Sequence, residues 1–299
     1  MPSDQSIGAS SGDTYKAGAA PHSPMQVLGV VGPSDSGKTT LVERLATRLA
    51  DRGRVATVKH CSHDPDLDTE GKDTARHRAA GADATYGLTD DAGWFATGAD
   101  RSLEATLDDL APDYDYAVVE GYTDAYLPQV ELGGREGAGT VLQRAERAAD
   151  VDLEALIATL EATDPHETLE ALVARVERSA DADRAGAIAT FTGRVRAKDS
   201  PDDERTEYLE FERYDGLAEE RIDALQADLE AREDVFAVAL HHRTGIIEAG
   251  EHVVFVVVLA GHRESAFRAV ENGIDRLKAE VPLFKKEVTV SEEFWRHER

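Results

Sequence analysis

The sequence predicts two domains in tandem, an α/β domain built on a mainly parallel sheet and a smaller α+β domain. Up to about residue 163, short apolar segments alternate with stretches of helical spacing, which is the pattern of a doubly wound sheet. After Asp164-Pro165 the apolar segments follow one another with fewer helices between them, which favours antiparallel pairing. We therefore expect a disordered tail at 1–24, where Ser, Gly, Ala and Pro predominate, followed by domains at 25–163 and 164–299.

The elements of the α/β domain follow from its apolar pattern and its glycines. The strands 26–31 and 54–59 are mostly apolar in succession, as strands covered on both faces are, and Gly53 stops the helix before the second strand. Strands are expected at 26–31, 54–59, 84–88, 93–97 and 115–120, and helices at 38–51, 73–80, 103–110 and 151–160.

The elements of the α+β domain are marked in the same way. In its last helix an apolar stripe recurs every three or four residues, and Pro282 ends that helix. Helices are expected at 169–178, 217–231 and 264–281, and strands at 186–195, 207–212, 235–242, 252–259 and 285–290.

Composition excludes several classes of protein. The 299 residues are 41% hydrophobic, which is enough for two domains, and no run of 18 apolar residues exists to cross a bilayer. The net charge of −26 disfavours nucleic acid and anionic membranes as partners. The single cysteine, Cys61, agrees with a reducing compartment, and we expect a cytoplasmic protein. Acidic residues are spread along the chain and lysine is scarce, which is typical of a halophilic protein.

A glycine-rich segment between the first strand and the first helix fills every fixed position of the GxxxxGK[S/T] pattern. In such a loop backbone N–H groups wrap phosphate, Lys38 reaches the β/γ oxygens and the Thr39 hydroxyl ligates Mg²⁺. The sequence thus predicts a P-loop domain that binds a nucleoside triphosphate. The expected nucleotide-binding residues of this loop are Gly32, Ser34, Asp35, Ser36, Gly37, Lys38, Thr39 and Thr40.

A carboxylate should accompany this loop at the end of a neighbouring strand, where it positions Mg²⁺ or water. Glu120 ends the apolar strand 115–120 and precedes a glycine, so Glu120 is the candidate. The alternative is one more exposed acid among the 59 Asp and Glu residues of the chain.

The phosphate loop is one part of a larger pattern over residues 25–132. Its other parts are Val58-Lys59-His60, His63, Asp68, Gly71-Lys72-Asp73-Thr74, Arg76, Ala80-Gly81-Ala82, Val119-Glu120-Gly121-Tyr122 and Pro128. Together they resemble MobB, the GTP-binding adaptor of molybdopterin guanine dinucleotide biosynthesis. The resemblance implies GTP and Mg²⁺ as cofactors, Asp68 near the γ-phosphate and the metal, and a MobA-like guanylyltransferase as partner. Because the chain has no Asn-Lys-x-Asp motif, the preference for GTP over ATP follows from the resemblance alone.

The second domain has a chemistry of its own. Lys278 and Lys285 flank the turn after the last helix, a spacing that can bring two amines to one pocket for nucleophilic or acid/base work. His262-Arg263 precedes the same helix, whose free N–H groups favour an anion, and Arg196 follows the first strand of the domain. The alternatives are solvated lysines and a histidine that caps or packs.

These residues belong to a second pattern, from about residue 165 to the C-terminus. Its segments are Phe191-Thr192-Gly193-x-Val195-Arg196, Leu209-Glu210-Phe211-Glu212-x-Tyr214, His242-Arg243-x-Gly245, Gly250-Glu251, Gly261-His262-Arg263, Ala266-Phe267, Leu277-Lys278 and Pro282-x-Phe284-Lys285-Lys286-Glu287. The set resembles MoaE, the catalytic subunit of molybdopterin synthase, and implies its α/β-hammerhead fold.

The second resemblance implies a reaction and a partner. The family takes sulfur from the thiocarboxylate of a MoaD-like, ubiquitin-fold carrier protein and converts cyclic pyranopterin monophosphate into molybdopterin. Lys278 and Lys285 would be catalytic, and Arg196, His262 and Arg263 would bind the pterin phosphate. Lys286 receives no role and is expected to be solvated.

Both resemblances lead to one pathway, molybdenum cofactor biosynthesis, and both families dimerise, so we expect a homodimeric fusion enzyme. Two alternatives remain open. The first is a P-loop kinase for a small molecule, for which Arg135, Arg144 and Arg147 would form a lid. The second is a scaffold without catalytic activity, which would tolerate the loss of Lys278.

Overall fold

The computed structural model describes residues 23–61, 72–90, 93–213, 216–289 and 293–297. The expected disordered tail at 1–24 lies almost wholly outside the described residues, and so does Asp68. No helix in the described part of the chain is long and apolar enough to cross a bilayer.

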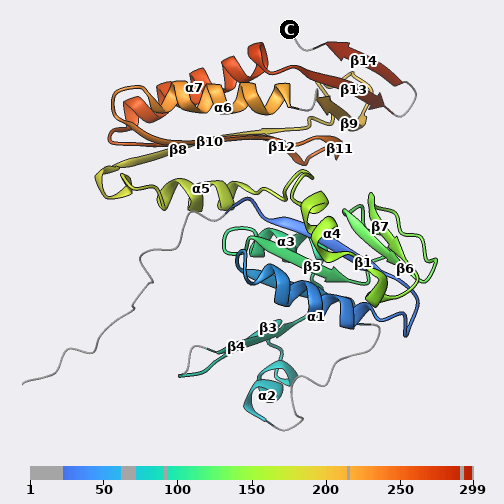
Figure 1. Cartoon of the computed structure of the whole chain (residues 1–299). Coiled ribbons are helices and arrows are strands. Elements are labelled where there is room, and N and C mark those ends of the chain that lie inside the picture. Colours follow the sequence, from blue (N-terminus) through green and yellow to red (C-terminus); the bar gives the residue numbers. More distant parts are fainter. Residues whose placement is uncertain (1–22, 62–71, 91–92, 214–215, 290–292, 298–299) are drawn as a thin grey trace, which may run out of the picture.

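The N-terminal domain contains a parallel sheet with the strand order β2-β5-β1-β6-β7 (Figure 1). Its strands are β1 (Gln26–Val31), β2 (Val55–Lys59), β5 (Tyr116–Glu120), β6 (Gln129–Leu132) and β7 (Val141–Ala145). The parallel fold and its first, second and last expected strands are confirmed, whereas the sequence did not predict β6 and β7.

Helices cover both faces of this sheet because successive side chains of a strand point to opposite sides. On one face, Leu28 and Val30 of β1 pack against α1 (Lys38–Leu49) and α4 (Leu153–Leu160). On the other face, Val27 packs against α3 (Leu103–Leu110). Since β1 is central and both its faces are buried, the loop that follows it starts from a fixed point.

Two expected strands lie outside the main sheet. The antiparallel hairpin of β3 (Ala84–Leu88) and β4 (Trp94–Gly98) forms a sheet of its own and contacts α2 (Asp73–Ala79). The expectation that these strands belong to the doubly wound sheet is wrong, because they pair with each other in a separate hairpin. Their large apolar side chains are therefore exposed and not covered by helices. Those exposed side chains are Tyr86, Leu88, Trp94 and Phe95.

The C-terminal domain contains two antiparallel sheets. The sheet β10-β12-β8 consists of β8 (Ala187–Arg194), β10 (Val235–His242) and β12 (His252–Ala260), and the sheet β11-β9-β13-β14 consists of β9 (Thr206–Arg213), β11 (Gly245–Glu248), β13 (Leu283–Thr289) and β14 (Glu293–His297). The α+β expectation is confirmed; β11 and β14 were not expected.

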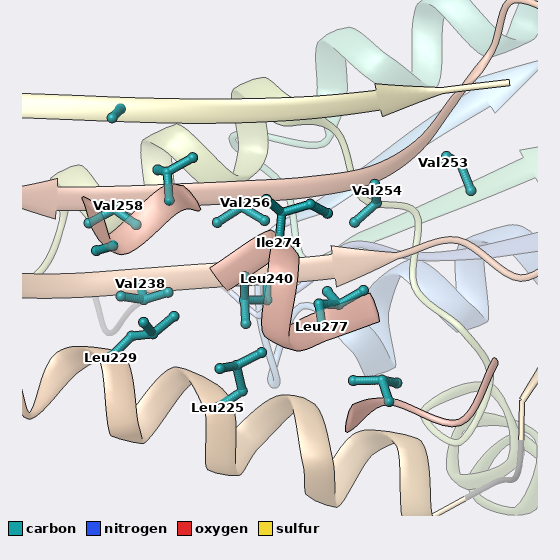
Figure 2. Packing of buried hydrophobic residues seen from close by; sticks show 14 of the residues in the cluster. Leu225, Leu229, Val238, Leu240, Val253, Val254, Val256, Val258, Ile274 and Leu277 are labelled. Carbon is teal, nitrogen blue, oxygen red and sulfur yellow. The ribbon is translucent and has the colours of Figure 1, made fainter. Parts of the chain in front are cut away.

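The helices α6 (Leu217–Glu230) and α7 (Arg263–Glu280) cover one face of the β10-β12-β8 sheet. Figure 2 shows Leu225 of α6 and Leu277 of α7 near Leu240 of β10, and Val256 on the adjacent strand β12. Long helices and a buried sheet thus hold both ends of α7 at fixed positions.

The helix α5 (Leu169–Glu177) lies between the two domains (Figure 1). Ala171 packs with Met25 and Val27 in the core of the N-terminal domain. Leu172, which is 0% exposed, packs with Val257 on the other face of the β10-β12-β8 sheet. One helix therefore contributes to two hydrophobic cores.

Polar contacts reinforce this junction. His166 Nε2 lies 2.8 Å from Asp108 Oδ1 of α3, and Arg178 Nη2 donates to Pro112 O at 2.8 Å. His166 N also donates to Met25 O at 2.8 Å. The domains are thus joined by packing and hydrogen bonds in addition to the covalent chain.

Candidate functional sites

The phosphate loop lies between β1 and α1, at the carboxyl edge of the parallel sheet. Gly37 immediately precedes α1 and has a φ of 90°, and Asp35 has a φ of 61°, a left-handed conformation that is uncommon away from glycine. A Cβ on Gly32 would lie 2.6 Å from Ser36 Oγ, which leaves no room for a side chain. Two glycines and one strained residue thus produce the sharp turn of the predicted loop.

Side chains of the loop point back at its own backbone. Lys38 Nζ donates to Gly32 O at 2.9 Å and to Pro33 O at 2.6 Å, and Ser36 Oγ donates to Pro33 O at 3.0 Å. Ser34 is exposed at the tip, and Thr40 is exposed in the first turn of α1. The Lys38 ammonium lies inside the curve of the loop, where it can meet phosphate oxygens.

Glu120 is buried, with 8% of its surface exposed, and it lies beside the loop. Thr39 Oγ1 donates to Glu120 Oε1 at 3.1 Å. Hydroxyl and carboxylate oxygens are the hard donors that Mg²⁺ prefers, so the pair fits this metal. The geometry therefore unites Thr39 and Glu120, which the sequence paired only by analogy with other P-loop proteins.

Lys59 joins this pair, and the sequence assigned no role to it. Its Nζ lies 3.0 Å from Glu120 Oε1 and 3.5 Å from Thr39 Oγ1. Lys59 and Glu120 are the last residues of β2 and β5 and face each other in the parallel register. The scarcity of lysine in an acidic chain was the signal that could have pointed to it.

The turn after Glu120 is strained. Gly121 has a φ of 92° and Tyr122 a φ of 50°. A Cβ on Gly121 would lie 2.8 Å from His60 Cβ, and the rings of His60 and Tyr122 are 4.9 Å apart. Strained backbone of this kind concentrates at functional sites, here at the edge of the sheet that carries the phosphate loop.

A second site is a cavity of about 410 Å³ in the C-terminal domain. Lys278 from the end of α7, Lys285 from β13 and Arg196 from the segment after β8 all line it. Lys278 is exposed, and Lys285 is half-buried. Its apolar wall includes Phe191 and Phe211. The helix end and the following strand thus bring both lysines to one pocket, as the spacing suggested.

Acidic and neutral groups complete the lining of this cavity. Arg196 Nη2 lies 3.0 Å from Asp199 Oδ1. His242 is 6% exposed, and its Nδ1 donates to Arg243 O at 2.7 Å, since a carbonyl oxygen can only accept. Burial lowers the pKa of His242 to about 4, so its imidazole is neutral at neutral pH. The lining thus contains four cations (Arg194, Arg196, Lys278 and Lys285), two carboxylates (Asp199 and Glu287) and one uncharged histidine, to which the sequence analysis gave no role.

His262 and Arg263 lie at the opposite end of α7. The 16 residues from His262 to Lys278 correspond to about 24 Å along a helix. Together His262 and Arg263 line an open hollow of about 640 Å³ at the start of this helix. In one copy of the chain they therefore lie too far from the lysine-lined cavity to act on the same ligand as Arg196 and Lys278.

Asp234 fixes the orientation of His262. Its Oδ2 lies 2.9 Å from His262 Nδ1, and this hydrogen bond lowers the pKa of the Asp234 carboxyl group. Asp234 has a φ of 69°, and a Cβ on Gly261 would lie 2.1 Å from Asp234 Oδ1. The contact depends on a strained residue and on a glycine, and it leaves His262 Nε2 directed away from the carboxylate.

Lys286 differs from the expectation that it is solvated. Its side chain is only 17% exposed, and its Nζ lies 3.5 Å from Glu210 Oε2. Lys286 and Glu210 are direct partners in the antiparallel pairing of β13 with β9. Neighbouring residues of a strand point to opposite faces, so Lys285 reaches the cavity while Lys286 forms a cross-strand pair.

Fold and sites together define a class: a P-loop domain of the nucleotide-binding type joined to an α+β domain with a lysine-lined cavity. Comparison with known proteins agrees. The family model described as molybdopterin guanine dinucleotide synthesis protein B (MobB) matches residues 27–163, and that described as MoaE protein matches residues 161–280.

Two curated proteins and one solved structure are similar to all or part of the chain. The chain is 52% identical over 275 residues to a probable molybdopterin synthase of Haloferax volcanii, covering 92% of this chain and 100% of that protein. A molybdopterin synthase catalytic subunit of Bacillus subtilis is 37% identical over 37% of this chain and 69% of its own length. A crystal structure of Bacillus subtilis MobB is 25% identical, with a TM-score of 0.35, over 47% of this chain and 99% of that one.

The chain belongs to the molybdopterin synthase family and carries a MobB domain before its MoaE domain. It is thus an enzyme of molybdenum cofactor biosynthesis.

Proposed function

We propose that the C-terminal domain transfers sulfur from a thiocarboxylated, MoaD-like carrier protein to cyclic pyranopterin monophosphate and so forms molybdopterin. The observation that supports this most is the cavity in which two of the chain's few lysines lie with Arg196. A volume of about 410 Å³ is in the range of small-molecule sites.

The residues divide the work by position. Lys278, exposed at the end of α7, meets the tail of the carrier, and the half-buried Lys285 acts on the pterin from the cavity wall. The amine pair assists the attack of the thiocarboxylate sulfur on the pterin side chain by moving protons and by stabilising negative charge. Arg196 holds the phosphate of the substrate. These side chains do their work without a metal ion.

The separation of His262 and Arg263 from the cavity supports a homodimeric site. Because about 24 Å lies between His262 and Lys278 along α7, both can serve one substrate only if a second copy supplies His262 and Arg263. Mixing Lys278→Ala chains with His262→Ala chains tests this: the mixed dimer contains one intact site, so activity of up to about a quarter of the parent's should return. If the mixture stays as inactive as its components, the shared site is excluded.

For the N-terminal domain, the proposal is binding of GTP with Mg²⁺ and assistance to a MobA-like guanylyltransferase in forming the guanine dinucleotide cofactor. The phosphate loop with Lys38, and the Thr39–Glu120 pair, support nucleotide and metal binding. When bound, Mg²⁺ would neutralise phosphate charge next to these two oxygens. Equilibrium binding of GTP and ATP to the parent chain and to Lys38→Ala tests the site and the choice of base.

The kinase alternative loses support in the segment that would form its lid. Arg144 Nε lies 2.7 Å from Glu131 Oε2, and Arg147 Nε lies 3.6 Å from Asp150 Oδ2. Two of the three arginines are thus paired with acids of their own domain.

The decisive experiment uses the full chain at high salt with thiocarboxylated carrier and cyclic pyranopterin monophosphate, and measures molybdopterin as its fluorescent oxidised derivative. Lys278→Ala should lower the rate by about 100-fold or more, as loss of an acid/base group does. Lys72→Ala is the control, because Lys72 is an exposed lysine of the N-terminal domain and does not line the cavity. Equal rates of the parent chain and Lys278→Ala would remove Lys278 from the proposed mechanism. No product from any of the chains, with the carrier verified as active, would support the scaffold alternative.

A further inference from the structure

We propose that Lys59 holds the metal position of the phosphate-loop site, so that Mg²⁺ binds there only by displacing its ammonium group. The proposal rests on the proposed nucleotide function of this domain. It makes Lys59 the residue that sets the affinity of the site for the metal, a role that neither the loop motif nor Glu120 provides.

The first argument is geometric. Lys59 Nζ lies 3.0 Å from Glu120 Oε1 and 3.5 Å from Thr39 Oγ1, and these two oxygens are 3.1 Å apart. One ammonium group therefore contacts both oxygens that fit Mg²⁺. A second cation at the same pair of oxygens meets strong repulsion at short distance, so the two are alternatives.

The second argument is the cost of burying a charge. Glu120 is 8% exposed, and a carboxylate at such a position needs a compensating cation. The parallel register places Lys59 directly beside it at the ends of β2 and β5, and His60 N donates to Glu120 O at 2.9 Å. The register of the sheet thus places the backbones of Lys59 and Glu120 side by side, within reach of an ion pair.

The third argument is that the side chains of Lys59 and Glu120 differ in mobility. The Lys59 side chain is 55% exposed, whereas the Glu120 side chain is 10% exposed. The flexible stem of lysine can carry the ammonium group into solvent or toward phosphate while the carboxylate stays in place. The exchange replaces one counter-ion of Glu120 by another, and no covalent bond changes.

The exchange makes metal binding depend on the nucleotide. Because Lys59 already neutralises the charge of Glu120, binding of free Mg²⁺ without nucleotide lowers the free energy only slightly. The phosphates of a nucleotide add oxygen ligands for the metal and a new partner for the released ammonium group. Lys59 thereby makes the site respond to the metal–nucleotide complex in preference to the metal.

The test measures metal binding to the full chain without nucleotide, with Mn²⁺ as the probe and the electron paramagnetic resonance signal of free Mn²⁺ as the readout. Lys59→Met keeps the length of the side chain and removes its charge, and it should raise the affinity at one site by about tenfold or more. Lys59→Arg keeps the charge and should gain nothing. Lys72→Met, a charge loss at an exposed lysine outside the site, should also gain nothing.

A further variant separates this site from weak binding to the acidic surface. In Lys59→Met/Glu120→Gln the gained Mn²⁺ site should disappear, because its carboxylate is gone. If Lys59→Met binds Mn²⁺ no better than the parent, or if the gain survives Glu120→Gln, the proposal is overturned. Circular dichroism of each variant verifies that it is folded.

Nucleotide binding measured in parallel keeps the two proposals distinguishable. A parent chain that binds neither GTP nor ATP, with a Lys59→Met variant that gains the Mn²⁺ site, would reject the nucleotide function and support the exchange. A parent chain that binds nucleotide, with a Lys59→Met variant that gains no Mn²⁺ site, would support the nucleotide function and reject the exchange.

Discussion

The two sites of this chain are assembled in different ways. The phosphate loop consists of consecutive residues between one strand and one helix, and its partners Lys59 and Glu120 end two adjacent parallel strands. The lysine-lined cavity collects residues from the helix α7 and from strands of both antiparallel sheets, namely β8, β9, β10, β12 and β13. A local motif fixes its own geometry, whereas a distributed site depends on the length and packing of every element between its residues. Mutations should therefore affect the two sites differently.

The largest expected effect is a loss of stability in both domains at once. Leu172 is 0% exposed in α5, and Leu172→Ala should lower the free energy of unfolding by about 2–5 kcal/mol, through lost transfer energy and a cavity. Because Ala171 of the same helix packs in the N-terminal core, the N-terminal domain should lose stability as well. Chemical denaturation measures the free energy of unfolding, and hydrogen exchange measures the protection of each domain separately. Full protection retained in the N-terminal domain would show that the cores are independent.

A smaller effect belongs to the distributed site alone and depends on pH. Burial lowers the pKa of His242 to about 4, below the value of about 6.5 in an unfolded chain. Between about pH 6.5 and 4 the unfolded state binds this proton and the folded state does not. The stability that the neutral His242 contributes is therefore fully present above about pH 6.5 and is lost as the pH falls through this window.

Denaturant unfolding across that window measures the contribution of His242. The slope of the unfolding free energy against pH should decrease by up to about 1.4 kcal/mol per pH unit in His242→Gln. His241, whose pKa burial lowers to about 3, should keep part of the slope in that variant. Identical slopes for parent and variant would contradict a buried neutral His242.

The smallest expected effect on stability distinguishes two neighbouring lysines of the strand β13. Lys286 pairs with Glu210 across β13 and β9, and Lys286→Met should change the free energy of unfolding by about 1 kcal/mol or less. Molybdopterin formation should stay at the parental rate. Lys285→Met, one residue away, should instead abolish most of the activity with a similar effect on stability. Equal activities of the two variants would remove Lys285 from the proposed mechanism.

The parts of the fold that the sequence predicted are those with a continuous local pattern. The strand Gln26–Val31 and the helix Leu103–Leu110 agree with their expected bounds. The strand β6 was missed because buried polar residues interrupt its apolar pattern: Gln129 is 1% and Glu131 3% exposed. Their hydrogen bonds to each other and to Arg144 cannot be inferred from hydropathy. In β7, the half-buried Gln143 and the exposed Arg144 interrupt the pattern.

The sites were predictable to the same extent. The loop residues and Glu120 follow from a motif and one strand end, whereas Asp68 lies outside the described residues. Lys278 and Lys285 were placed together by the turn between them. The distance of His262 from Lys278 was already implied by the expected helix 264–281, since rise per residue fixes it. Lys59 required the register of two strands that are not consecutive in the sequence.

The shared helix α5 has a consequence for synthesis of the chain on the ribosome. On the α3 face of the N-terminal sheet, the buried cluster includes Ala171, which lies more than 50 residues along the chain after Val119, the buried residue that precedes it in this cluster. The domain therefore cannot complete its packing when its own sheet has emerged, but only after α5 has left the exit tunnel. Until the first helix of its neighbour arrives, the part of the α3 face that Ala171 covers, next to Met25 and Val27, stays exposed in the nascent N-terminal domain.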